Sequence, residues 1–228
     1  MGSFKPKLNI LPSRQRLVWE RLGSTPPHFV LYGGTALALR LGHRDSLDFD
    51  FFSSRPFRPL ELFRSIAYLQ GQRVTQQAEN TLSCEIETKE GGVNVSFFGG
   101  LSMRQIATPD AAGSNGVAVA SLLDLFGTKC TTVAQRSEAK DYRDVHALLT
   151  AARLSLPEGI AAARAIFGRQ YDPLVTLKAL SYFADLDEPL DDTTQSELLA
   201  AVSAVSLQKL PVITATDDIG AGIERSRP

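Results

Sequence analysis

A strand, a glycine turn, a helix and a second strand, all between residues 29 and 52, constrain the fold of this 228-residue chain more than any other feature. Residues 29–32 are apolar, residues 33–35 are Gly-Gly-Thr, and strong helix formers fill residues 36–41. Residues 47–52 are apolar except for two aspartates, and their aromatic content is typical of a strand. We therefore expect a helix that begins at a glycine turn and connects two strands of a sheet.

The two aspartates of the second strand, Asp48 and Asp50, predict a metal site. Side chains two positions apart on a strand share a face, so both carboxylates project from the same side. Their mutual repulsion is unfavourable unless a cation lies between them. Mg²⁺, or Mn²⁺ in its place, takes oxygen ligands and is usually held by one or two carboxylates together with substrate phosphates. We therefore predict Asp48 and Asp50 as metal ligands and as catalytic residues.

The glycine turn predicts a binding site for a nucleoside triphosphate, formed by Gly33, Gly34 and Thr35. Backbone amides at a helix start favour anions, and glycines leave room for phosphate oxygens. Thr35 could cap the helix or donate a hydrogen bond to an oxygen. Taken alone, a Gly-Gly pair is more often only a tight turn, and Asp-x-Asp is common in solvated loops. The order and the short separation of the two motifs favour phosphoryl transfer on a nucleotide.

A later segment, residues 121–149, has apolar residues at helical spacing, interrupted by basic groups. Lys129, Arg136 and Lys140 could neutralise the charge of a triphosphate there. The alternative is a solvated helix face whose salt bridges contribute little to stability.

Two acids lie in the same segment, Asp141 and Asp144, three residues apart on the predicted helix. Their spacing predicts ion pairs with Arg143 or Lys140 on the same helix. Asp141 is also a candidate to complete the catalytic site.

These motifs together resemble the signature of the AbiEii/AbiGii toxin family of nucleotidyltransferases, within the polymerase-beta-like superfamily. The motifs are Gly33-Gly34-Thr35-Ala36-Leu37, Leu41-Gly42-His43-Arg44, Ser46-x-Asp48-x-Asp50-Phe51-Phe52, and the later residues Lys129, Arg136, Lys140-Asp141 and Asp144. The resemblance implies a nucleotidyltransferase fold and a metal-dependent transfer of a nucleoside monophosphate to an RNA, including transfer RNA, or to a protein. It also implies a toxin of a toxin–antitoxin or phage abortive-infection system, with an antitoxin as partner.

One departure from the superfamily pattern concerns the third carboxylate, which is commonly found on a neighbouring strand. The matching residues, 92–98, contain no acid. Asn94 and Ser96 share a face and could orient water or a ribose hydroxyl, but neither is an anionic ligand. Glu85 and Glu87 on the preceding strand could substitute if the hairpin register allows, although an exposed strand face is the simpler interpretation. A catalytically degenerate nucleotide-binding or protein-interaction module is therefore the alternative function.

Composition sets further limits on partners and location. A formal net charge of -1 excludes a globally basic nucleic-acid binder, so an RNA substrate would need a local patch. Such a patch could form from five arginines near the proposed site: Arg40, Arg44, Arg55, Arg58 and Arg64. Cys84 and Cys130, the only cysteines, have no metal or redox spacing and suit a reducing cytoplasm. No leader and no membrane-length apolar segment is apparent, so we expect a cytoplasmic protein without membrane contact.

The overall expectation is an α+β fold with a mixed sheet flanked by helices and a C-terminal helical region. Residues 1–115 would form the nucleotidyltransferase core with an N-terminal helix, residues 116–216 a helical region that closes the nucleotide cleft, and residues 217–228 a flexible tail. Predicted strands are 29–32, 47–52, 74–78, 82–88 and 93–98, and predicted helices are 13–22, 36–41, 59–69, 119–149, 157–167, 173–183 and 194–207.

Overall fold

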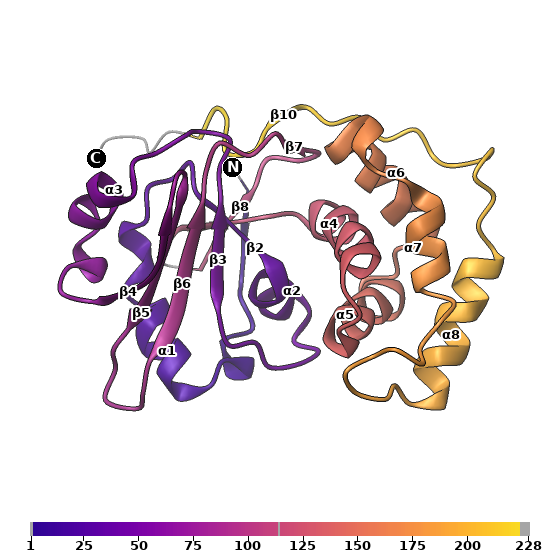
Figure 1. The fold of residues 1–228 in the computed structure, drawn as a ribbon, viewed down its shortest axis with the longest axis horizontal. Helices are drawn as coiled ribbons and strands as arrows, with labels where there is room; N and C mark the ends of the chain where they lie inside the picture. The colour runs from indigo at the N-terminus through magenta and orange to yellow at the C-terminus, as the bar shows by residue number, and fades with distance from the viewer. Residues whose placement is uncertain (1, 114, 224–228) are drawn as a thin grey trace. The chain divides into compact units, whose positions relative to one another are not determined.

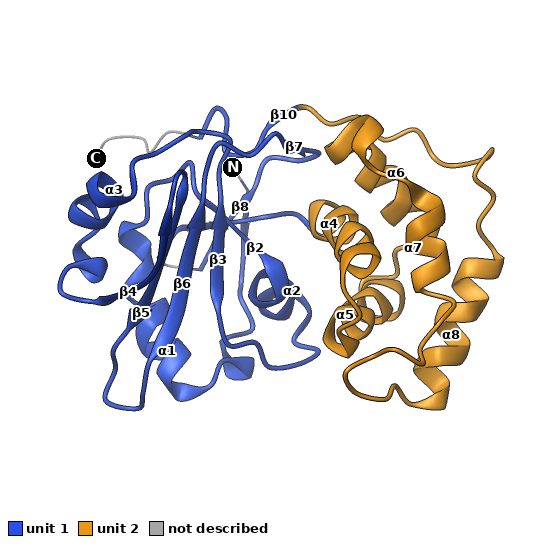
Figure 2. Cartoon of the chain, in the orientation of Figure 1, with its two compact units in different colours: residues 1–121, 217–228 blue, residues 122–216 orange. Residues whose placement is uncertain are grey.

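The computed structural model describes residues 2–113 and 115–223, and its elements are shown in Figure 1. The chain forms two compact units (Figure 2). Unit 1 comprises Met1–Ser121 and the segment from Asp217 onward, and unit 2 comprises Leu122–Thr216. The first unit extends beyond the expected boundary at residue 115 because Val117–Val119 is a strand of its sheet.

Unit 1 contains an eight-stranded mixed sheet, which confirms the predicted α+β class. The strand order is β1-β8-β9-β2-β3-β6-β5-β4. The strands are β1 (Ser3–Phe4), β2 (Val30–Tyr32), β3 (Phe49–Phe52), β4 (Arg73–Ala78), β5 (Thr81–Ile86), β6 (Val93–Phe98), β8 (Asp110–Ala112) and β9 (Val117–Val119). The pairs β1–β8, β2–β9 and β3–β6 are parallel, and the other neighbours are antiparallel.

The core of unit 1 lies on the face of the sheet that receives alternate side chains of β3 and β6. Phe49, Phe51 and Phe97 are fully buried there, and the rings of Phe51 and Phe97 stack with centroids 5.3 Å apart. Each such burial contributes about 1.5–3 kcal/mol. The opposite face carries Asp50 and Ser96, so the alternation of the strands separates the apolar core from the polar site.

The helices of unit 1 are α1 (Ser13–Trp19), α2 (Gly33–Leu41) and α3 (Pro59–Ser65). Two of them end earlier than predicted, and each is followed by a short 3₁₀ turn, at Leu22–Ser24 and Ala67–Leu69. Helix α2 begins at Gly33 rather than at residue 36, so both glycines of the turn lie in its first turn.

Unit 2 consists of five α-helices: α4 (Leu122–Gln135), α5 (Ala139–Thr150), α6 (Leu156–Phe167), α7 (Pro173–Ala179) and α8 (Asp192–Ser203). The single helix predicted over residues 119–149 is wrong, because the chain leaves the helical conformation at residues 136–138. Asp187, from a distant loop, explains the break. Its carboxylate accepts a hydrogen bond from the Ala139 amide at 2.7 Å, which satisfies a free donor at the start of α5. No helix in the described ranges is both long and apolar enough to cross a membrane.

The segment after unit 2 differs from the expected flexible tail over residues 217–223. Strand β10 (Asp217–Asp218) pairs with β7 (Arg104–Gln105) in a separate two-stranded sheet. Ile219 is fully buried, and its carbonyl accepts a hydrogen bond from the Ser54 amide at 3.0 Å. This segment is therefore part of unit 1, and residues 224–228 lie outside the described ranges.

Candidate active site

Of the two predicted metal ligands, Asp48 lies in a loop and Asp50 lies in a strand. Strand β3 begins at Phe49, so Asp48 precedes the strand and its residue is exposed. Asp50 lies within the strand, opposite Tyr32 of β2 and opposite Ser96 of β6. The strand register fixes Asp50 from both sides, whereas Asp48 depends on other contacts for its position.

The glycine turn lies directly beside Asp50. Gly33 has a φ of +72°, and a Cβ atom at this position would lie 3.0 Å from the Asp50 Oδ2 atom. An alanine here would be strained and would crowd the carboxylate. The start of α2 and the Asp50 carboxylate therefore lie side by side, although the sequence presents them as two separate motifs.

Two polar side chains that follow α2 reach back to the same turn. A Cβ atom at Gly34 would lie 2.6 Å from the Arg44 Nη2 atom and 3.2 Å from the Ser46 Oγ atom. Arg44 and Ser46 stand in the motifs that resemble the family, and Arg44 was also expected in a local basic patch, but neither was predicted to contact the glycine turn. Their place in the sequence could have predicted this contact. They lie in the short connection between α2 and β3, and such a connection must run back along the helix toward its first turn.

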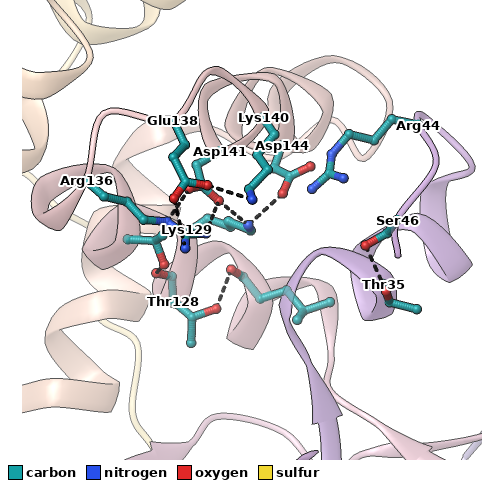
Figure 3. A network of polar contacts seen from close by, with 12 residues as sticks. Thr35, Arg44, Ser46, Thr128, Lys129, Arg136, Glu138, Lys140, Asp141 and Asp144 are labelled. Carbon is teal, nitrogen blue, oxygen red and sulfur yellow. Dashed lines mark hydrogen bonds and ion pairs between the residues drawn. The ribbon is translucent and has the colours of Figure 1, made fainter. Parts of the chain in front are cut away.

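Thr35 does not cap α2, which was one of the two contacts expected of it. Its side chain is buried, with 2% exposure, and α2 has no side-chain cap. The Thr35 hydroxyl donates to the backbone carbonyl of Asp48, and its oxygen lies 2.8 Å from the Ser46 Oγ atom (Figure 3). In this structure Thr35 thus holds the loop that carries Asp48.

The strand register also decides what lies beside Asp50. Ser96 is its direct neighbour on β6, and the next residue across is Ser83 on β5, whose hydroxyl lies 3.0 Å from that of Ser96. Glu85 shares this face, opposite Asn94. Two strand spacings separate Glu85 from β3, or about 10 Å.

Glu85 has a partner of its own, since the Arg73 Nε atom donates to its carboxylate at 2.8 Å. Glu87 lies beyond the end of β5 and is exposed. Within residues 2–113 and 115–223, no group of three or more Asp, Glu, His or Cys side chains could hold a metal ion. A third carboxylate from β5 is therefore not part of the Asp48–Asp50 site.

The donor set of unit 1 fits a hard cation. Asp48 and Asp50 offer carboxylate oxygens, and Ser96 offers a hydroxyl beside Asp50. Mg²⁺ is often bound through one or two carboxylates while water and phosphate oxygens complete the octahedron. The absence of Cys and His from this group disfavours zinc.

In unit 2, Lys129 is the centre of an ionic network whose buried members are Lys129, Asp141 and Asp144 (Figure 3). The Lys129 side chain is 6% exposed, and its Nζ atom lies 2.6 Å from Asp141 Oδ1 and 2.6 Å from Asp144 Oδ2. The Arg136 Nε atom donates to Asp141 Oδ2 at 2.8 Å. Burial opposes the ionisation of Asp141, but the hydrogen bond from Arg136 and the charge of Lys129 outweigh it and lower the pKa of Asp141.

The predicted pairing of Asp141 and Asp144 with Arg143 or Lys140 is wrong. Lys140 instead contacts Glu138 at 2.6 Å, and Arg143 contacts Glu188 at 3.1 Å. The acids find their main cation on α4 because residues 121–149 form two packed helices rather than one.

Known proteins are similar to this chain over residues of both units. The profile of a family described as "Nucleotidyl transferase AbiEii toxin, Type IV TA system" matches residues 18–201. An uncharacterized protein of Aquifex aeolicus (strain VF5) is 32% identical over 162 residues, which cover 70% of this chain and 76% of that protein. Among solved structures, MenT4, a nucleotidyltransferase toxin from Mycobacterium tuberculosis H37Rv, is similar with a TM-score of 0.54 and 16% identity, over 84% of each chain. At this identity, the last likeness concerns the fold alone.

Proposed function

The chain belongs to the AbiEii family of nucleotidyltransferase toxins, as its motifs predicted, and we propose that it transfers a nucleoside monophosphate from a nucleoside triphosphate to an RNA or protein acceptor, releasing pyrophosphate. The observation that carries the proposal is the Asp50 carboxylate beside the glycine turn at the start of α2. Phosphoryl transfer needs positioning and charge neutralisation more than covalent chemistry. The backbone amides of the turn would position the phosphates, and a cation held by the carboxylates would neutralise their charge.

The roles in unit 1 follow from its geometry. Backbone amides at Gly33 and Gly34 would bind phosphate oxygens, and the Arg44 guanidinium beside Gly34 would bind another. Asp48 and Asp50 would hold Mg²⁺ or Mn²⁺, which when bound would stabilise the charge of the phosphates and activate the acceptor oxygen.

Ser96 lies opposite Asp50 on β6, the strand that matches the one on which the superfamily commonly carries a third carboxylate. Its hydroxyl, with the Asn94 amide, would orient the acceptor or the ribose but would not remove a proton as a strong base. A loose transition state requires little deprotonation of the acceptor, so this substitution is compatible with turnover.

In unit 2 we propose that Lys129, Arg136 and Lys140 neutralise triphosphate charge and that Asp141 helps to complete the site. The Arg136 and Lys140 side chains are 46% and 51% exposed. Lys129 is buried and already contacts two carboxylates, so its charge is partly offset. We therefore expect replacement of Arg136 or Lys140 by methionine to raise KM for the nucleotide with a smaller effect on kcat.

The direct test is label transfer with the Asp48→Asn variant, which removes the charge but keeps the shape. Purified protein is incubated with Mg²⁺, each α-labelled nucleoside triphosphate, total RNA and a protein extract. We expect transfer by the unmutated protein and its loss in Asp48→Asn, with no loss of stability because the mutation relieves repulsion with Asp50. Asp45→Asn, an exposed acid on the same loop, is the matched control and should retain transfer.

Two results would contradict the proposal. One is full activity in Asp48→Asn. The other is nucleotide binding by the unmutated protein without any transfer, which is the behaviour of a degenerate binding module. The class of labelled product identifies the acceptor as RNA or protein.

The toxic role comes from membership of the family, and we propose that it depends on the same site. Induced expression of the unmutated chain should arrest bacterial growth, while Asp48→Asn should not. An antitoxin partner would be identified as a coexpressed neighbouring gene that relieves the arrest. Equal arrest by both forms would separate toxicity from nucleotidyl transfer.

A further inference from the structure

Gln15 of α1 is a buried polar residue that the packing of the helix does not explain. Its residue exposure is 1%, and its Nε2 atom donates to the backbone carbonyl of Leu47 at 2.8 Å. Its Oε1 atom is buried and has no hydrogen-bond partner within the described ranges. A buried amide that leaves an acceptor unpaired is less stable than an apolar side chain of the same size. Stability therefore favours methionine or leucine at this position.

The contact made by Gln15 adjoins Asp48. The residue before Asp48 has its carbonyl held by Gln15, and the carbonyl of Asp48 itself is held by Thr35. The residue after it, Phe49, enters the sheet opposite Val95. Asp48 precedes the first paired residue of β3, so side chains from α1 and α2 replace the backbone ladder there.

We infer that Gln15 is a positioning residue that orients Asp48 for metal binding, an inference that rests on the proposed function. Metal affinity depends on ligands that are held in place before the ion arrives, and loss of a supporting hydrogen bond typically weakens binding 10–100-fold. In this role Gln15 touches neither the metal nor the substrate. It acts through the backbone between Leu47 and Asp48.

The test is a titration of the full chain with Mn²⁺, in which the free ion is measured by electron paramagnetic resonance. Gln15→Met should raise the Kd for Mn²⁺ by about tenfold or more. Its Tm should change by less than about 3 °C, because Leu47 is 50% exposed and water can replace the lost donor. A second variant, Gln15→Leu, should behave alike.

Gln195→Met is the matched control, because the Gln195 Nε2 atom donates to the Leu190 carbonyl at 2.8 Å in unit 2. It removes the same kind of hydrogen bond and should leave the Kd for Mn²⁺ unchanged. A positioning role therefore shows as weaker metal binding without a comparable fall in Tm.

Asp48→Asn separates failure of this inference from failure of the proposed function. If Asp48→Asn weakens Mn²⁺ binding while both Gln15 variants bind as tightly as the unmutated protein, Gln15 has only a structural role. If Asp48→Asn also leaves binding unchanged, the proposed metal site is wrong and the inference falls with it.

Discussion

Lys129→Met should destabilise the helical unit by about 3 kcal/mol. Removal of one partner from a buried ion pair typically costs about 3–5 kcal/mol, and the Asp141 and Asp144 side chains that contact Lys129 are both fully buried. We expect the lower end of that range, because Arg136 still contacts Asp141 and methionine fills most of the space of the lysine stem. With a urea m-value of about 1.5–3 kcal/mol/M, the unfolding midpoint should fall by about 1–2 M.

The assay is urea unfolding of the full chain, monitored by circular dichroism at a helical wavelength, at pH 7 and at a pH well below the ordinary aspartate pKa of about 4. The folded state lowers the pKa of Asp141, so that carboxylate stabilises the fold above about pH 4 and loses this effect as the pH falls through its lowered pKa. Without Lys129 the pKa moves back toward its ordinary value. The difference between the two proteins should therefore shrink in acid.

Lys178→Met is the control for this prediction, since Lys178 is an exposed residue of α7 in the same unit. It should change the unfolding free energy by no more than about 0.5 kcal/mol. If Lys129→Met is as stable as Lys178→Met at pH 7, the ionic network does not stabilise the unit and the reasoning is refuted.

Two pairs of glycine substitutions, each a variant and its control, test the packing of unit 1. Gly33→Ala and Gly71→Ala introduce the same backbone strain, about 1–2 kcal/mol, at φ values of +72° and +78°. Only the first crowds the Asp50 carboxylate, so label transfer should fall in Gly33→Ala alone, and equal activity in both would show that the contact is unimportant. Gly220→Ala should release the C-terminal segment, because its Cβ would overlap a backbone carbonyl oxygen, while Gly222→Ala meets no atom within 4 Å. Limited proteolysis should cleave the segment faster in the first variant, and equal cleavage rates would contradict the docking.

Residues 29–52 predicted β2, α2 and β3 because apolar runs, helix formers and a glycine turn act on neighbouring residues of the chain. Strand β6 has the predicted bounds, Val93–Phe98, since its alternation matches a half-buried strand. Strand β3 starts later than predicted because the Asp48 carbonyl is bound by a threonine hydroxyl instead of a neighbouring strand. The alternation of apolar and polar residues cannot predict that a side-chain hydroxyl, and not a neighbouring strand, binds this carbonyl.

Sequence spacing did not predict those hydrogen bonds and ion pairs whose partners come from distant segments of the chain. The break between α4 and α5 depends on Asp187, which lies far beyond the helical pattern that it interrupts. The pairing of Asp141 with Lys129 requires that break, because the two residues lie on different helices. The role of Gln15 was equally hidden, since its partner is a backbone carbonyl 32 residues away.

The two carboxylates of the site therefore respond to different perturbations. Asp50 is held by strand pairing on both sides, so its position cannot change without disruption of the sheet. Asp48 is held by two side-chain hydrogen bonds, from Gln15 and Thr35, which can be removed without breaking any ladder. Mutations that uncouple metal binding from stability should accordingly cluster around Asp48, whereas mutations that move Asp50 should lower both together.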